Sequence, residues 1–166
     1  MTDEQKRIRG YLQAQGAKLS PLDVIDKVRA AMADLSMAAG AVPAVRFTER
    51  PEPEEWSGNE VMAHVVDAGR HFGDQIVAIL DGRPRVATDR TREEGERTAE
   101  EWCALLAHDR DALFARVRAA DPQAGLGETI EHGMFGPLTW RETLLFMRLH
   151  DLDHVGQLQK IAAALA

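Results

Sequence analysis

The sequence predicts an all-α protein, a four-helix bundle, from three observations. Apolar residues recur at helical spacing in four long segments. Each segment opens with a residue that caps helices, and the first three end at a glycine or a proline. The 166 residues suit one domain, in which we expect residues 20–166 to form the bundle and residues 1–19 to be an N-terminal extension.

The first bundle helix is predicted to begin after Ser20, whose hydroxyl can cap it, with Pro21 at the first helical position. Gly40 is its natural end. A long crossover, residues 41–56 with three prolines, connects it to the second helix. The inward side of the first helix is given by its apolar repeat: Val24, Ile25, Val28, Ala31, Met32 and Leu35.

The second and third helices each open with a capping box, a serine or threonine followed three residues later by glutamate. The second begins at Ser57 and ends near Gly82, and the third begins at Thr98 and ends near Asp121 and Pro122. The second helix carries a histidine within its apolar track: Val61, His64, Val65, Ala68, Phe72, Ile76 and Ile79.

Residues 122–138 are rich in glycine, so we expect a small hairpin or an ordered loop there. The fourth helix then opens with a third capping box at Thr139. Its inward track contains two histidines: Trp140, Leu144, Met147, His150, His154, Leu158, Ile161 and Leu165. Residues 1–19 are expected either to form a short extra helix around Ile8 and Leu12 or to stay mobile.

Composition and charge argue against several classes of protein. The net charge is −7 and no lysine or arginine cluster forms a stripe, so nucleic acid is not an expected partner. No run of about 18 apolar residues exists, so we expect no membrane span. Cys103 is the single cysteine, which rules out an internal disulfide and suits the reducing cytoplasm.

Three histidines carry the strongest functional signal. His150 and His154 are four residues apart, so both imidazoles can point to one spot on a helix face. His64 lies on the apolar side of the second helix. Three imidazoles converging inside a bundle can hold a divalent metal ion and leave one coordination position open, as in catalytic sites. A single buried histidine is better explained by a hydrogen bond to a carbonyl or carboxylate, but this spacing favours a metal.

The other polar residues near this predicted site are open to two interpretations. Asp67, Asp151 and Asp153 are spaced to hold the second nitrogen of a ligating histidine, or they are solvated surface carboxylates. Asp67 and His132 are the candidates for a general acid or base. Trp56 is interpreted as a staple at the start of the second helix rather than a ligand contact.

Two blocks of sequence resemble the DinB/YfiT-like superfamily of metal-binding four-helix bundles. The first is the Trp-Ser-x-x-Glu-x-x-x-His pattern from Trp56 to His64. The second begins at Thr139-Trp140 and contains the His-x-x-x-His-x-Gly-Gln ending from His150 to Gln157. The resemblance covers about residues 20–165. It implies that His64, His150 and His154 are the ligands and that the metal is zinc or nickel.

The resemblance also implies a class of reaction and an oligomeric state. The superfamily includes mycothiol-dependent maleylpyruvate isomerase, bacillithiol transferases and related domains in ergothioneine biosynthesis, and many members are homodimers. We therefore expect a metal-dependent enzyme that transfers or adds a low-molecular-weight thiol to an electrophilic small molecule, or hydrolyses one. The metal would deprotonate a bound thiol or lower the pKa of bound water. The alternative is a metal-binding or stress-linked dimeric protein without turnover.

Overall fold

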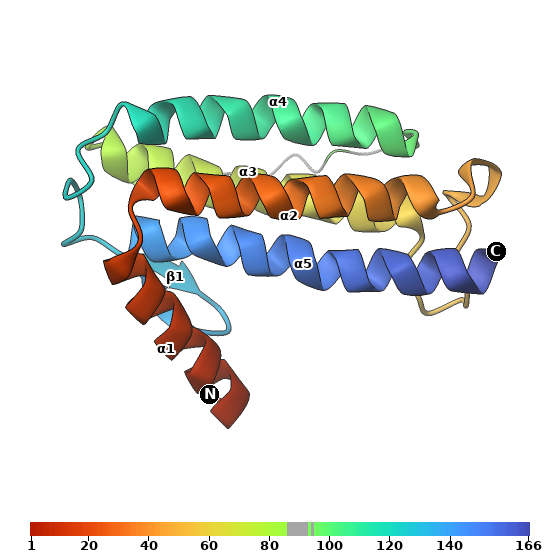
Figure 1. Cartoon of the computed structure of the whole chain (residues 1–166), viewed down its shortest axis with the longest axis horizontal. Coiled ribbons are helices and arrows are strands. Elements are labelled where there is room, and N and C mark those ends of the chain that lie inside the picture. The colour runs from red at the N-terminus through yellow and green to blue at the C-terminus, as the bar shows by residue number, and fades with distance from the viewer. Residues whose placement is uncertain (86–92, 94) are drawn as a thin grey trace.

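The computed structural model describes residues 1–85, 93 and 95–166, and this part of the chain is mostly helical (Figure 1). Its elements, in chain order, are helix α1 (Asp3–Lys18), helix α2 (Pro21–Ala41), the short 3₁₀ helix η1 (Ala44–Arg46), helix α3 (Gly58–Leu80), helix α4 (Ala99–Arg118), strands β1 (Ile130–His132) and β2 (Gly136–Leu138), and helix α5 (Trp140–Leu165). The strands form a small hairpin, the first of the two alternatives expected for residues 122–138, and it is an antiparallel pair with Ile130 opposite Leu138.

The predicted helix starts are confirmed by their caps. The Ser20 side chain accepts a hydrogen bond from the Asp23 backbone N–H, and Pro21 is the first residue of α2. Ser57, Thr98 and Thr139 form complete capping boxes with Glu60, Glu101 and Glu142. Each box satisfies backbone N–H groups that no helical carbonyl can reach, which fixes where the helix begins.

Residues 1–19 contain a full helix, as in the first of the two alternatives expected from the sequence, and not a mobile segment. Thr2 and Gln5 form a capping box at the start of α1. α1 packs on α5 through Leu12, which is fully buried, and leans away from the other helices beside the hairpin (Figure 1). A Cβ on Gly16 would lie 2.9 Å from the Glu142 side chain, so glycine allows this close approach.

α2, α3, α4 and α5 lie side by side, and their main contacts run α2–α5, α5–α3, α3–α4 and α4–α2 (Figure 1). The buried apolar side chains form two clusters, the first of which also includes residues of α1 and of the hairpin. One contains Leu12, Phe114 and Trp140, and the other contains Met62, Trp102 and Leu158. Among the described residues, no helix combines the length and apolar character needed to cross a membrane.

A polar layer separates the two apolar clusters. On α5 the clusters leave a gap between Met147 and Leu158, and His150, Asp151 and His154 lie within it. Arg110 occupies the matching gap on α4. Buried polar groups are costly unless they find partners, so this layer marks the part of the core that apolar packing alone does not explain.

Candidate metal centre

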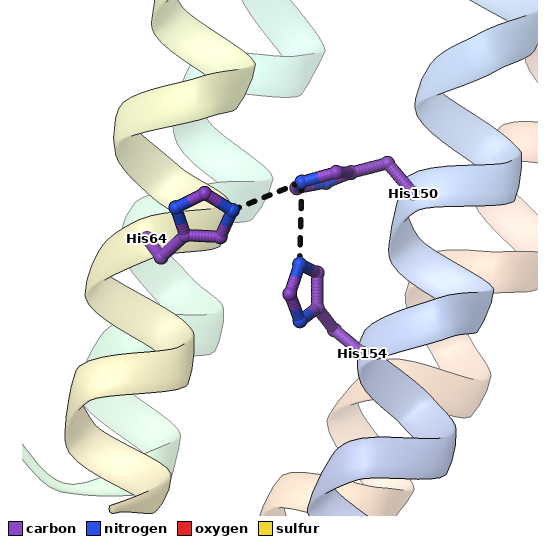
Figure 2. Close-up of side chains that lie close together, drawn as sticks. All are labelled: His64, His150 and His154. Carbon is purple, nitrogen blue, oxygen red and sulfur yellow. Dashed lines mark hydrogen bonds between the residues drawn. The ribbon is translucent and has the colours of Figure 1, made fainter. Parts of the chain in front are cut away.

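The three predicted histidines meet between α3 and α5 (Figure 2). The Nε2 atom of His150 lies 3.1 Å from Nε2 of His64 and 3.2 Å from Nε2 of His154. One ring nitrogen from each residue lies within 4.8 Å of the other two. Nitrogens bound tetrahedrally to an ion at about 2.0–2.1 Å would be roughly 3.3 Å apart, so the spacing suits one shared ion.

Hydrogen bonds among the three imidazoles explain these short nitrogen–nitrogen distances less well than a shared metal ion does. A neutral imidazole nitrogen carries either one hydrogen or one lone pair. His150 Nε2 faces two other nitrogens at once, so a single proton or lone pair on it cannot form two good hydrogen bonds. Three lone pairs directed at one cation would satisfy all three rings.

The electrostatic surroundings keep His150 neutral. Burial first, and then the neighbouring His154 and His64, lower the pKa of His150 to about 3. Arg110 acts in the same direction. At neutral pH the imidazole is therefore uncharged and its lone pair is available, which is the form that binds a metal.

The second ring nitrogen of His154 is held by an amide rather than a carboxylate. Gln157 Oε1 lies 2.7 Å from His154 Nδ1 and accepts its hydrogen, which leaves the Nε2 lone pair pointing to the other histidines. Of the carboxylates considered for this role, Asp153 is exposed. The Asp151 carboxylate is hydrogen-bonded to Arg110 instead.

Asp151 is fully buried, so the surface interpretation is wrong for this residue. Its carboxylate accepts two hydrogen bonds from the Arg110 guanidinium, at 2.9 and 3.0 Å, and Arg110 is 2% exposed. A Cβ on Gly69 of α3 would lie 3.4 Å from that guanidinium, so the glycine gives the arginine room. The pair joins α4 to α5 at the residue next to His150.

The two candidate acid–base residues are both buried. Asp67 is 8% exposed on α3, one turn beyond His64. His132 is 7% exposed on β1, where its ring stacks on Phe72 at 4.4 Å and meets the edge of Phe146 at 4.2 Å. Burial, and to a lesser extent His71, lower the pKa of His132 to about 4. Neither Asp67 nor His132 is among the residues that line the hollows next to the three histidines.

Trp56 lines both hollows, although the sequence interpretation gave it the role of a staple at the start of the second helix rather than a ligand contact. The Trp56 ring is 37% exposed and its centroid is 5.1 Å from that of His64. One hollow, of about 420 Å³, reaches His64 and is otherwise lined by Arg50, Trp56, Asn59, Glu60, Ala63, Glu93 and Gly95. The other, of about 470 Å³, reaches His154 and is otherwise lined by Glu54, Glu55, Trp56, Gln157, Lys160 and Ile161.

The crossover between α2 and α3 positions Trp56. Phe47 of this segment is 3% exposed and its carbonyl accepts a hydrogen bond from the Asn59 N–H at 3.0 Å. A Cβ on Gly58 would lie 2.7 Å from the Phe47 ring, so the segment packs closely on the start of α3. The sequence signal for Trp56 was its place as the first residue of the Trp-Ser-x-x-Glu-x-x-x-His pattern that ends at His64.

The remaining histidines lie apart from the three. His71 contacts the Gln75 side-chain amide at 2.8 Å and packs against Phe72. His108 is exposed on α4.

Comparison with known protein families matches the chain to the DinB superfamily over residues 27–158. The chain belongs to the DinB superfamily. The matched range contains His64, His150 and His154 as well as Trp56 and Gln157, and it leaves out α1. This agrees with the resemblance inferred from the sequence. A comparison with curated proteins found no match.

Proposed function

We propose that this DinB superfamily protein binds one divalent metal ion through His64, His150 and His154 and transfers or adds a low-molecular-weight thiol to an electrophilic small molecule. The observation that carries the proposal is the convergence of three Nε2 atoms. Two of the three residues, His64 and His154, each border a hollow. Zinc and nickel are the ions that we expect, because neutral imidazoles suit both.

The residues present fit such an ion. The donor set is three neutral nitrogens, and the pKa of His150, lowered to about 3, keeps protons from competing at neutral pH. Gln157 fixes the His154 ring in the tautomer that presents Nε2. Three protein ligands would leave a four-coordinate ion with one position for a substrate.

When bound, the ion would lower the pKa of a thiol or water molecule in that position. In the thiol reaction, the thiol loses its proton and its sulfur forms a bond to an electrophilic carbon. In an addition, the displaced π electrons move to the neighbouring atom, which takes a proton from solvent. In a transfer by substitution, the leaving group departs with the electron pair of its bond to that carbon. The protein would hold the two reactants in the hollows beside Trp56, which supplies proximity and orientation.

The hollows favour an enzyme over the alternative of a metal-binding protein without turnover. A protein that only holds an ion needs no space for a second molecule, whereas His64 and His154 each border a hollow of more than 400 Å³. Volumes of about 300–1,000 Å³ are typical of small-molecule sites. The same hollows would admit water and an electrophile, so hydrolysis is the second reaction to test.

Metal analysis tests the ligand assignment. The purified protein should contain about one zinc or nickel ion per chain, and His150→Ala should lose it. His108→Ala, which removes an exposed histidine outside the group, should keep the metal. Equal metal content in the His150 and His108 variants would refute the assignment.

A thiol screen tests the reaction. Mycothiol, bacillithiol, glutathione and cysteine are each combined with a generic electrophile, with metal-loaded protein, chelator-treated protein and His150→Ala in parallel. Acceleration that requires the metal supports thiol transfer. If no thiol is accelerated while an ester or amide substrate is hydrolysed, the protein is a hydrolase; if neither occurs, the non-catalytic alternative is favoured.

We also infer that α2–α5 constitute the four-helix bundle of this superfamily and that α1 is an addition to it. The family match begins at residue 27, inside α2, which supports this division. A homodimer and a cytoplasmic location stay predictions. Sedimentation equilibrium of the full chain would test the first, with twice the 18.4 kDa chain mass as the expected result.

A further inference from the structure

The buried pair of Arg110 and Asp151 brings a full positive charge into the layer of the core that holds the three histidines. Arg110 lies on α4, and Asp151 directly follows His150 on α5. Both side chains are buried, and the guanidinium donates one hydrogen bond to each oxygen of the carboxylate. The carboxylate therefore cancels a charge that solvent cannot screen.

The charge of Arg110 reaches the histidines. Burial is the main reason why the pKa of His150 is low, the other two imidazoles come next, and Arg110 acts in the same direction. A cation that disfavours a proton on His150 also disfavours a metal ion bound to it, because both place positive charge on the same ring. The His154 ring is held by the neutral amide of Gln157, which supplies no negative charge to offset this repulsion.

We propose that Asp151 allows a divalent ion to bind to the three histidines by cancelling the charge of Arg110. The two residues then have opposite effects on metal affinity: Asp151 raises it and Arg110 lowers it, although neither is a ligand. Asp151 acts through Arg110, so it is a positioning residue and not a catalytic one. This inference rests on the metal-binding part of the proposed function and adds two residues that tune it.

The neutrality of this pair also matters for the chemistry of the ion. A carboxylate beside the ligands with no arginine would offset part of the charge of the ion. Because the pair as a whole carries no net charge, the ion keeps its own charge to acidify the molecule in its open position.

Two carboxylates nearer the surface are also paired with arginines, but solvent reaches those pairs. Glu60 accepts hydrogen bonds from Arg50, and Glu93 forms an ion pair with Arg70. Glu60 and Glu93 line the hollow at His64, and all four side chains are partly exposed. Water and salt screen such charges, so the buried pair should affect the ion most.

Metal affinity in four variants tests the opposite signs. Asp151→Asn keeps the shape of the side chain but leaves Arg110 unmatched, Arg110→Met removes the cation, and the double variant with both changes removes both charges. Asp81→Asn is the matched control. Its carboxylate also accepts a hydrogen bond from an arginine of α4, Arg116 at 2.7 Å, but this pair is partly exposed and Asp81 caps the far end of α3 from His64.

Zinc affinity is measured by competition with a chelating dye, and circular dichroism checks that each protein is folded under the same conditions. Asp151→Asn should weaken zinc binding at least about tenfold, as expected for an unmatched buried charge on the order of 10 Å from a doubly charged ion. Arg110→Met should bind zinc at least as tightly as the wild type, because no unmatched cation is left. The double variant and Asp81→Asn should keep the wild-type affinity.

A purely structural role for the pair predicts a different pattern. Both single variants would then bind zinc more weakly than the wild type, and the double variant would not recover. Weaker binding by Arg110→Met, or no recovery in the double variant, overturns the proposal.

The charge of the ion separates repulsion from a distorted set of ligands. An unmatched cation repels Zn²⁺ twice as strongly as Cu⁺ at the same position. The logarithm of the affinity loss in Asp151→Asn should therefore be about twice as large for Zn²⁺ as for Cu⁺, which is kept reduced with ascorbate under nitrogen. Equal losses for the two ions would mean that the substitution disturbs geometry, and the proposal would be wrong.

A failure of this inference can be told apart from a failure of the proposed function. If the wild-type protein binds neither ion, the ligand assignment is wrong and the inference falls with it. If the wild type binds zinc but the variants do not change affinity in the expected directions, the metal centre stands and only the role of Arg110 and Asp151 is refuted.

Discussion

Breaking the buried ion pair between Arg110 and Asp151 should be the most damaging single change outside the three histidines. The two side chains are 2% and 0% exposed and share two hydrogen bonds of 2.9 and 3.0 Å. The third guanidinium nitrogen, Nε of Arg110, already lacks a hydrogen-bond partner within the described residues. Asp151→Leu would leave a buried cation with no counter-charge.

The expected loss of folding stability follows from the burial of Arg110 and Asp151. Removing one member of a buried pair costs about 3–5 kcal/mol. For a chain of this size, 1 kcal/mol corresponds to a fall of roughly 2–4 °C in Tm, so Tm should fall by roughly 6–20 °C. Adding Arg110→Met to Asp151→Leu should restore most of the loss, because two apolar side chains need no counter-charge.

Urea denaturation followed by circular dichroism would measure these free energies. A chelator is kept in all samples so that loss of metal does not contribute. Asp153→Leu serves as the control, since Asp153 is a neighbouring but exposed carboxylate, and it should change the unfolding free energy by less than about 0.5 kcal/mol. The reasoning is refuted if Asp151→Leu costs less than 1 kcal/mol, or if the double variant loses as much as the two single changes added together.

Three further predictions concern the neighbourhood of the metal centre. Gln157→Leu should lower metal affinity about 10–100-fold without unfolding the protein, because His154 loses the acceptor that fixes its tautomer; competition with a chelating dye would measure it. The folded-state pKa of His132, about 4, lies below the unfolded value of 6.5, so stability should fall by about 3 kcal/mol as the pH drops from 6.5 to 4. His132→Phe should flatten that part of the pH profile, and an unchanged slope would contradict the burial argument. Nickel or cobalt should quench the fluorescence of Trp56, 5.1 Å from the His64 ring, and Trp56→Phe should abolish most of the quenching.

Local signals in the sequence were sufficient for the helices and for the histidines. Capping boxes act over three residues, so Ser57, Thr98 and Thr139 could be identified without knowing the tertiary structure. The i, i+4 spacing of His150 and His154 is equally local. The fold prediction depended on such patterns, and the helical content follows from them.

The parts that were missed depend on contacts between distant segments. Asp151 follows His150 directly, so its side chain points about 100° away around the helix, and its burial depends on Arg110, 41 residues earlier. Trp56 lies outside any helix, and its position is set by the packing of Phe47 on Gly58. No periodic pattern in the sequence encodes either contact.

The crossover between α2 and α3 separates two tasks that many sites combine. The histidines belong to long helices anchored by the core, whereas Glu54, Glu55 and Trp56 belong to an irregular, exposed connection. Replacing the exposed Glu54 and Glu55 should barely affect folding or ion retention. Selectivity for a new small molecule can therefore be engineered, or can evolve, by exchanging a handful of loop residues while the inorganic centre stays intact.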